Sequence, residues 1–309
     1  MDVAFVVLVV NAGSTSLKLS LVDGDESQAV ETLDVEADAV AHRIVHGGDL
    51  YTEPVVVDAR VRDALHALVE LAPLHNAPAL AALDDARRAL PGVPHVAVFD
   101  TAFHATLTGL ARAYAVSPSV GIRRYGFHGL AVQSVAEQVR VPRLVVCHLG
   151  GGCSVTAVRD GRSVETSMGF TPLEGVPMST RSGSVDPGAV LHLVRERGVD
   201  EVSDLLEHES GLLGVSGLSG DVRELEADPR GDFALDLLGY RVAQAVAACA
   251  VALDGVDAIA FSCGIGEHSA RVREGVASRL RFLGQVDVRV VRSREDVVAA
   301  RAARLVLRG

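Results

Sequence analysis

The chain has 309 residues, of which 49% are hydrophobic and 22% are charged. Its 29 lysine and arginine residues against 40 aspartate and glutamate residues give a formal net charge of −11, which argues against a nucleic-acid partner held by bulk charge. This length is enough to bury a sizeable core in one large or two medium domains. The four cysteines have no C-x-x-C spacing, so we expect reduced thiols and a cytoplasmic protein.

The predicted elements alternate between strands and helices along the chain. The first apolar run, residues 6–10, follows no basic residue and is far shorter than a membrane span, so we expect a buried strand without a signal peptide or membrane segment. Further strands are predicted at residues 96–99, 144–148 and 258–262. Helices are predicted at residues 59–71, 79–90, 130–139, 188–197, 233–253 and 295–306. This alternation predicts an α/β fold with functional turns at strand ends.

Two glycine-rich turns, at residues 11–16 and 150–154, each follow a strand and precede β-like sequence. This near-repeat predicts a duplicated domain in which each half offers a phosphate-binding turn from a hairpin, with the active site in the cleft between the halves. The first turn is not a Walker loop. Its alternative interpretation is a hairpin turn with a surface lysine, but Lys18 is the only lysine in a chain that otherwise uses arginine.

Four further segments carry polar residues beside strand ends or glycines. Arg43 in HRIVHGG could hold a carboxylate or phosphate, or form a strand-end salt bridge. Asp100 in FDTAFH follows a strand directly, as a functional carboxylate or as a helix cap. His128 in RRYGFHG could be catalytic or a core histidine, and Arg181 lies among small polar residues. Together, these groups would suit stabilising the charge on a transferring phosphoryl group.

In this order, the segments resemble the acetate kinase family, within the acetate and sugar kinase, Hsc70 and actin superfamily. The resemblance covers nearly the whole chain and rests on NAGSTSLK, HRIVHGG, LAPLHN, FDTAFH, RRYGFHG, SVETSMGFTPLEG followed by TRSG and DP, GLLGVSGLS and GIGE. It implies two duplicated actin-like, or ribonuclease H-like, domains with mixed sheets flanked by helices. The expected N-terminal domain is residues 1–101 plus 296–309, and residues 102–295 form the expected C-terminal domain with the nucleotide site.

The resemblance implies reversible phosphoryl transfer from ATP to acetate, giving acetyl phosphate and ADP, with Mg²⁺ or alternatively Mn²⁺. The matches to the family's catalytic positions are Asp100, His128 and Arg181. The matches to its substrate site are Arg43, Val45, Leu74, His75, Phe127 and Pro172. The matches to its ATP site are Ser14, Ser16, Lys18, His148, Leu149, Gly150, Gly151, Gly152, Asp221, Val222, Arg223, Gly264, Ile265, Gly266, Glu267 and His268. Asn11 and Glu295 match the positions that hold the metal ion.

Acetate is already ionised near neutral pH, so no general base is needed. We therefore expect Asp100 to orient metal or water. The chain has two asparagines, Asn11 and Asn76. Asn76 follows His75 in the segment LAPLHN, which we expect near the substrate. By family analogy we also expect a homodimer.

The sequence departs from the family pattern at several positions. Residues 130–132 are Leu-Ala-Val where Thr-Ser-His is usual, Gly151 and His268 stand where asparagine is usual, and Ser-Arg-Glu at 293–295 replaces Thr-Asn-Glu. Two stretches, 23–42 and 273–295, are also shorter than in typical members. The alternatives left open are a propionate or butyrate kinase and a non-catalytic nucleotide-binding member.

Overall fold

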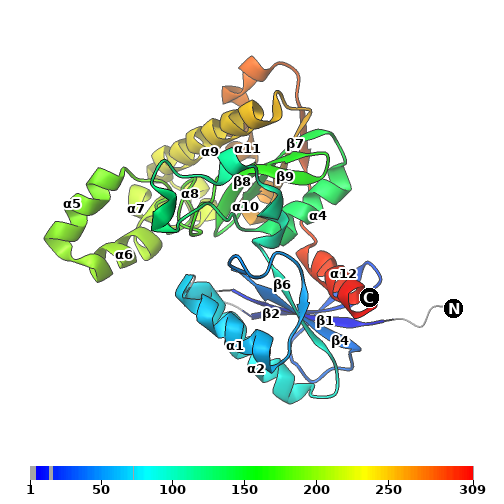
Figure 1. Cartoon of the computed structure of the whole chain (residues 1–309). Helices are drawn as coiled ribbons and strands as arrows, with labels where there is room; N and C mark the ends of the chain where they lie inside the picture. Colours follow the sequence, from blue (N-terminus) through cyan, green and yellow to red (C-terminus); the bar gives the residue numbers. More distant parts are fainter. Residues whose placement is uncertain (1–4, 14–16, 72, 309) are drawn as a thin grey trace. The chain divides into compact units, whose positions relative to one another are not determined.

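The computed structural model describes residues 5–13, 17–71 and 73–308, without the side chains of residues 70–75. The described chain divides into two compact units (Figure 1). Unit 1 comprises residues 1–105, 127–134 and 294–309, and unit 2 comprises residues 106–126 and 135–293. Each unit is built on its own mixed sheet, and we describe each by itself.

Unit 1 contains a six-stranded sheet in the order β3-β2-β1-β4-β6-β5. Its strands are β1 (Val7–Ala12), β2 (Leu17–Asp23), β3 (Glu26–Val30), β4 (Ala39–Ile44), β5 (Val55–Val56) and β6 (His95–Phe99). β1, β2 and β3 form an antiparallel meander, and β1, β4 and β6 run parallel. The carboxyl ends of the three parallel strands therefore meet at one edge of the sheet.

Helices cover both faces of this sheet, because its central strands are apolar on both sides. In β1, Leu8 and Val10 pack with α2 (Pro73–Ala89), whereas Val7 and Val9 pack with α12 (Glu295–Arg308). Figure 1 shows α1 (Ala59–Ala67) beside α2 on the first of these faces. The short helices η1 (Leu68–Leu71) and η2 (Ala102–Thr106) follow α1 and β6, and α4 (Gly129–Val139) begins in unit 1.

Unit 2 contains a five-stranded sheet in the order β11-β10-β7-β8-β9. Its strands are β7 (Arg143–Leu149), β8 (Cys153–Arg159), β9 (Arg162–Thr166), β10 (Ala258–Ser262) and β11 (Asp287–Val290). β7, β8 and β9 form an antiparallel meander, and β7, β10 and β11 run parallel. Read from the third strand of each meander, both sheets have the same strand order apart from the added edge strand β5.

The long helix α9 (Asp232–Leu253) packs against β7, β8 and β9, and α11 (Ala270–Arg279) packs against α9. A segment that includes α9, Pro229–Leu253, is the one stretch of the described residues long and apolar enough to cross a membrane, but half of its most apolar window is buried in this packing. It therefore behaves as a core helix. The remaining helices are α3 (Gly109–Arg112), η3 (Pro118–Val120), α5 (Pro187–Arg197), α6 (Val199–His208), α7 (Gly211–Ser216), α8 (Val222–Ala227), η4 (Pro229–Gly231), α10 (Cys263–His268) and η5 (Arg281–Leu283).

The sequence prediction of an α/β fold with two duplicated units is confirmed, and so are all four predicted strands. The expected start of one helix was wrong. The helix predicted to begin at residue 79 begins at Pro73 and continues through Pro78, because the buried amide of Asn76 fixes its first turn to the preceding chain. The Gly-x-Gly stretch at 264–266 belongs to the helix α10. The predicted domain boundaries stay a prediction beside the compact units described above.

Candidate active site

Three predicted residues meet at the carboxyl edge of the unit 1 sheet. Asn11 lies near the end of β1, Arg43 near the end of β4, and Asp100 directly after β6. The Arg43 guanidinium donates from Nε and Nη2 to Oδ2 of Asp100, at 3.0 and 2.5 Å, and from Nη1 to Oδ1 of Asn11 at 2.8 Å. The Asp100 side chain is fully buried and that of Arg43 is 15% exposed. The strand-end salt bridge considered for Arg43 is therefore present, within a group of predicted site residues.

Glu295 joins this group from a distant part of the chain. It is the first residue of α12, and its Oε1 accepts a hydrogen bond from Nδ2 of Asn11 at 3.0 Å. Asn11 thus uses its amide oxygen toward Arg43 and its amide nitrogen toward Glu295. The two residues predicted to hold the metal ion are in direct contact. The described residues contain no group of three or more His, Cys, Asp or Glu side chains that could hold a metal ion alone.

The segment around His128 packs onto the backbone of Asp100. Gly129 donates its N–H to the carbonyl of Asp100 at 3.0 Å, and a Cβ at position 129 would overlap that carbonyl oxygen. His128 has a φ of +62°, a conformation that costs a non-glycine residue energy and is held only where its surroundings determine it. The sequence Gly-Phe-His-Gly therefore fixes His128 in the same unit as Asp100.

Apolar residues predicted for the acyl pocket lie in the same unit. Val45 and Phe127 are both buried, and the ring of His46 meets the ring of Phe127 edge-on at a centroid distance of 5.4 Å. Asn76 holds this part of the chain by accepting from the N–H of His46 and donating to its carbonyl, both at 3.1 Å. Leu74 and His75 lie on α2, but their side chains are outside the described residues.

The histidine of the FDTAFH segment, His104, is structural. The Nε2 of His104 lies 2.9 Å from the carbonyl oxygen of Phe127, next to His128 in sequence. Burial lowers the pKa of His104 to about 4 and, with a smaller contribution from nearby His95, lowers the pKa of His42 to about 3. Both histidines are therefore neutral at physiological pH. They support the strands and loops that carry Arg43, Asp100 and His128.

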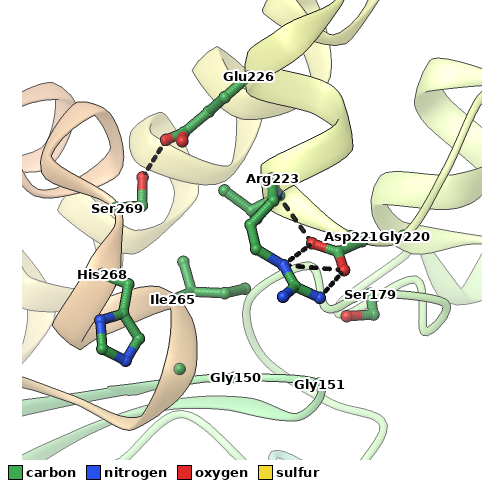
Figure 2. Close-up of a pocket in the computed structure, with 12 residues that line it drawn as sticks. Gly150, Gly151, Ser179, Gly220, Asp221, Arg223, Glu226, Ile265, His268 and Ser269 are labelled. Carbon is green, nitrogen blue, oxygen red and sulfur yellow. Dashed lines mark hydrogen bonds and ion pairs between the residues drawn. The ribbon is translucent and has the colours of Figure 1, made fainter.

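Unit 2 contains a pocket of about 630 Å³, a volume that suits a small-molecule ligand (Figure 2). It is lined by Gly150, Gly151, Ser179, Gly220, Asp221, Val222, Arg223, Glu226, Gly264, Ile265, His268 and Ser269. Eight of these residues were predicted for the ATP site from three separate segments. The structure brings together the turn between β7 and β8, the start of α8 and the helix α10.

Gly150, at the start of the β7–β8 turn, lies close to the side chain of Cys263 and leaves no room for a Cβ. A Cβ on Gly150 would lie 2.6 Å from Sγ of Cys263, which opens α10 with a φ of +65°. A Cβ on Gly151, where the family usually has asparagine, would meet nothing within 4 Å. The turn therefore tolerates a side chain at 151 and none at 150 without movement.

Both carboxylates that line the pocket, those of Asp221 and Glu226, have polar partners. Asp221 caps α8 and forms an ion pair with Arg223, whose Nη2 lies 2.5 Å from Oδ2 of Asp221. Hydrogen bonds from the Arg223 side chain and backbone lower the pKa of the Asp221 carboxyl. Across the pocket, the Ser269 hydroxyl donates to Oε1 of Glu226 at 2.5 Å (Figure 2).

Four lining residues were not predicted from the sequence. Gly220 directly precedes the predicted Asp221 and Ser269 directly follows the predicted His268, so neighbouring positions were the only signal for them. Ser179 and Glu226 belong to no predicted nucleotide segment. Ser179 lines the pocket because its backbone carbonyl lies close to Gly220. A Cβ at position 220 would lie 2.8 Å from that carbonyl oxygen.

Five residues of unit 2 that were predicted for the ATP site do not line this pocket: His148, Leu149, Gly152, Gly266 and Glu267. His148 is buried, with its Nδ1 3.2 Å from the Ser262 hydroxyl. Glu267 accepts from the backbone N–H of Cys263 at 3.0 Å and so stabilises the start of α10. These residues support the walls of the pocket.

The remaining predictions for the ATP site lie in unit 1. Lys18 is exposed on β2, in register with Asn11 of β1. Ser14 and Ser16 lie outside the described residues. The expected hairpin is present around that turn, since β1 and β2 are antiparallel.

Arg181 and Pro172 belong to unit 2. The Nε of Arg181 lies 3.1 Å from Oε2 of Glu207, near the end of α6. Both side chains of this pair are mostly buried, at 16% and 19% exposed. Glu207, which sequence analysis did not single out, orients the guanidinium of Arg181.

Two α/β units that repeat one strand order, each with a glycine-rich hairpin turn, define the actin-like class of proteins. Within that class the chain belongs to the acetate kinase family: the model described as "Acetokinase family" matches residues 25–306. The acetate kinase of Heliobacterium modesticaldum (strain ATCC 51547 / Ice1) is 46% identical over 268 residues, which covers 81% of this chain and 68% of that relative.

Solved structures agree with this assignment. A propionate kinase from Francisella tularensis subsp. tularensis SCHU S4 aligns with a TM-score of 0.88 at 30% identity, covering 96% of this chain and 98% of the other. The acetate kinase of Porphyromonas gingivalis aligns with a TM-score of 0.87 at 30% identity, covering 98% of this chain and 100% of the other. The resemblance read from the sequence is thereby confirmed at the level of family and fold.

Proposed function

We propose that this protein is an acetate kinase, which transfers the γ-phosphoryl group of ATP to acetate, and the reverse. The observation that carries the proposal is the contact group of Asn11, Arg43, Asp100 and Glu295, four residues from four separate elements that match functional positions of the family. The pocket of unit 2 supports a nucleotide as the second ligand.

The arginines reduce the electrostatic repulsion between the two anionic reactants. A carboxylate is repelled by the phosphates that it must attack, so cationic groups must cancel that repulsion and align the two reactants. Arg43 can offer a planar pair of N–H donors to a carboxylate, and Arg181 and His128 can offer positive charge or hydrogen bonds to the transferring group. Proton removal contributes nothing, because acetate reacts as the anion.

Asp100 has a positioning task in this proposal. Its Oδ2 accepts two hydrogen bonds from Arg43, which aligns the guanidinium plane, and its backbone carbonyl accepts from Gly129 beside His128. Asp100 therefore connects the predicted carboxylate-binding arginine, through its carboxylate, with the segment of the predicted catalytic histidine, through its backbone carbonyl. We infer that it orients these groups, together with metal or water.

The donor set suits Mg²⁺, with Mn²⁺ as an alternative. Glu295 offers a carboxylate and Asn11 an amide oxygen, and their mutual contact places both at one strand end. Such a sparse set of hard oxygen ligands fits an ion that keeps several waters and is bound largely through the phosphates of a nucleotide. When bound, the ion would shield the β- and γ-phosphate oxygens.

The proposal is tested by incubating the protein with ATP, Mg²⁺ and acetate in hydroxylamine, which traps acyl phosphates as hydroxamates. We expect acetohydroxamate that requires protein, ATP and metal, and its loss when EDTA replaces the metal. No hydroxamate with acetate, propionate or butyrate would instead support a non-catalytic nucleotide-binding protein.

A propionate or butyrate kinase is the second candidate. The structural similarity to a propionate kinase favours it, and one methylene in an apolar pocket changes binding by only about 1–3 kcal/mol. The same assay with three acids at equal concentration decides between these candidates. The homodimer and the cytoplasmic location remain predictions, and light scattering after gel filtration tests the first.

A further inference from the structure

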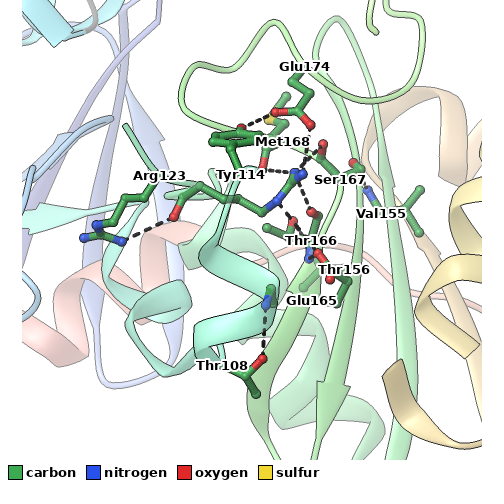
Figure 3. A network of polar contacts seen from close by, with 12 residues as sticks. Thr108, Tyr114, Arg123, Val155, Thr156, Glu165, Thr166, Ser167, Met168 and Glu174 are labelled. Atoms are coloured by element: carbon green, nitrogen blue, oxygen red, sulfur yellow. Dashed lines mark hydrogen bonds and ion pairs between the residues drawn. The ribbon is translucent and has the colours of Figure 1, made fainter. Parts of the chain in front are cut away.

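The backbone at the end of β9 converges on one mostly buried arginine, Arg124. Nη1 of Arg124 donates to the carbonyl oxygens of Thr166, Ser167 and Met168, at 3.0, 3.1 and 3.0 Å (Figure 3). These carbonyls lie at the last residue of β9 and at the two residues that follow it. Because the Arg124 side chain is only 17% exposed, the guanidinium takes the place that water would otherwise fill.

A carboxylate and a phenol extend the same network. Nη2 of Arg124 donates to Oε1 of Glu174 at 2.8 Å, and the Tyr114 hydroxyl donates to Oε2 of the same carboxylate. The Tyr114 oxygen also accepts from the N–H of Phe170 at 2.9 Å. Burial, with a hydrogen bond to Glu174, raises the pKa of Tyr114 to about 12, so this hydroxyl remains a donor at physiological pH.

Gly169, within this stretch, has no room for a side chain. A Cβ on Gly169 would overlap both the Glu174 carboxylate and the Tyr114 hydroxyl. The carbonyl of Gly169 accepts from the N–H of Tyr125 at 3.0 Å, one residue beyond Arg124. Residues 166–174 are therefore fixed from both the side chain and the backbone of the 124–125 segment.

We propose that Arg124 is a positioning residue that determines which short carboxylic acid the enzyme accepts, by holding the backbone of residues 166–174 that presents Pro172. This inference rests on the proposed function, because Pro172 is a predicted wall of the acyl pocket. A small shift of that wall changes the length of the acyl chain that fits. Glu174 and Tyr114 act in the same way, through the segment that they hold.

Lysine cannot replace arginine in this geometry. The guanidinium is a rigid plane whose Nη1 reaches the three carbonyls while its Nη2 reaches the Glu174 carboxylate, whereas an ammonium is a single point of charge. Arg124→Lys therefore keeps the charge and loses the spacing. Tyr114→Phe removes only the hydroxyl that joins Glu174 to Phe170.

The experiment measures kcat and KM of the wild type, Arg124→Lys and Tyr114→Phe, with acetate and propionate and with ATP varied separately. The matched control is Arg143→Lys, another arginine of unit 2 that pairs with a carboxylate, Asp257, and with the carbonyl of Asp254. Hydrogen exchange of the 166–175 peptide provides a readout that does not depend on activity.

For Arg124→Lys we expect the KM for acetate to rise about tenfold, with the KM for ATP within about twofold of wild type. The ratio of kcat/KM for propionate to that for acetate should change about threefold or more, and the 166–175 peptide should exchange faster. Tyr114→Phe should give smaller changes in the same direction, and Arg143→Lys should give none of them.

Three outcomes would overturn the inference. These are an unchanged acid preference in Arg124→Lys, equal losses for acid and ATP, or, if that variant does not fold, an unchanged preference in Tyr114→Phe. A wild type that forms no acyl phosphate would instead refute the proposed function, so the two failures are distinguishable.

Discussion

Asn11 and Asn76 each form hydrogen bonds with both the oxygen and the NH2 group of the side-chain amide. Asn11 accepts from Arg43 and donates to Glu295, and Asn76 accepts from and donates to the backbone of His46. Aspartate lacks the donor and a hydroxyl lacks the reach, so neither position tolerates the chain's commoner residues. The two asparagines of this sequence are therefore explained by geometry, one within the site and one as support for it.

The role of Asp100 leads to a prediction at the same scale. Asp100→Asn should lower kcat by about 10³-fold, since the buried negative charge that aligns Arg43 is lost. Acetate binding should be nearly intact, because Arg43 keeps its charge and an amide oxygen as partner. The hydroxamate assay gives kcat, and the acetate-dependent rise of the thermal midpoint reports binding.

Asp84→Asn is the matched control, since Asp84 forms a two-pronged ion pair with Arg62 elsewhere in unit 1. It should leave turnover within about twofold of wild type. If Asp100→Asn abolishes acetate binding together with turnover, Asp100 belongs to the binding site itself and the positioning role is refuted.

The β7–β8 hairpin shows how an element builds a ligand site. Its turn must pass close to the start of α10, and the thiol of Cys263 leaves space for a glycine and for nothing larger at position 150. Gly150→Ala should therefore displace the turn and raise the KM for ATP about tenfold, with a much smaller effect on the KM for acetate.

Gly151→Ala provides the comparison, because a Cβ at 151 meets nothing within 4 Å. It should raise the KM for ATP much less than Gly150→Ala does. Steady-state kinetics with each substrate varied in turn decides the matter, and equal effects of the two substitutions would contradict this account of the turn.

Element-scale prediction from the sequence succeeded where a segment carries its own signal. The buried strands and both glycine hairpins are local patterns, and so is the placement of Arg43 and Asp100 at strand ends. Prediction failed where the partner is distant in sequence. The pairing of Arg181 with Glu207 and the entry of Glu226 into the pocket depend on tertiary packing that no local pattern encodes.

At the scale of the whole molecule, two buried neutral histidines make stability depend on pH. Burial lowers the pKa of His42 to about 3 and that of His104 to about 4, against 6.5 for the unfolded chain. Below pH 6.5 these histidines bind protons in the unfolded state and stay neutral in the folded state. Their contribution to the free energy of unfolding is therefore fully present above pH 6.5 and is lost as the pH is lowered toward 4. At a pH well between its folded and unfolded pKa values, each histidine lowers the free energy of unfolding by about 1.4 kcal/mol per pH unit.

Thermal midpoints measured from pH 7.5 to 4.5 should therefore decline below about pH 6.5. His104→Gln keeps a donor for the carbonyl of Phe127 and removes the titration, so its decline should be shallower. A decline as steep as that of the wild type would show that other groups control acid stability.

In the proposed reaction the phosphoryl group moves to a carboxylate oxygen of acetate and not to water. Acetate labelled with ¹⁸O in both carboxylate oxygens tests this directly. With ATP, Mg²⁺ and hydroxylamine, the nucleophile attacks the acyl carbon of the acyl phosphate, and phosphate leaves with the bridging oxygen. The account predicts inorganic phosphate that carries one ¹⁸O by mass spectrometry, in an amount equal to the hydroxamate formed. Unlabelled phosphate without hydroxamate would show hydrolysis of ATP by water and contradict the account.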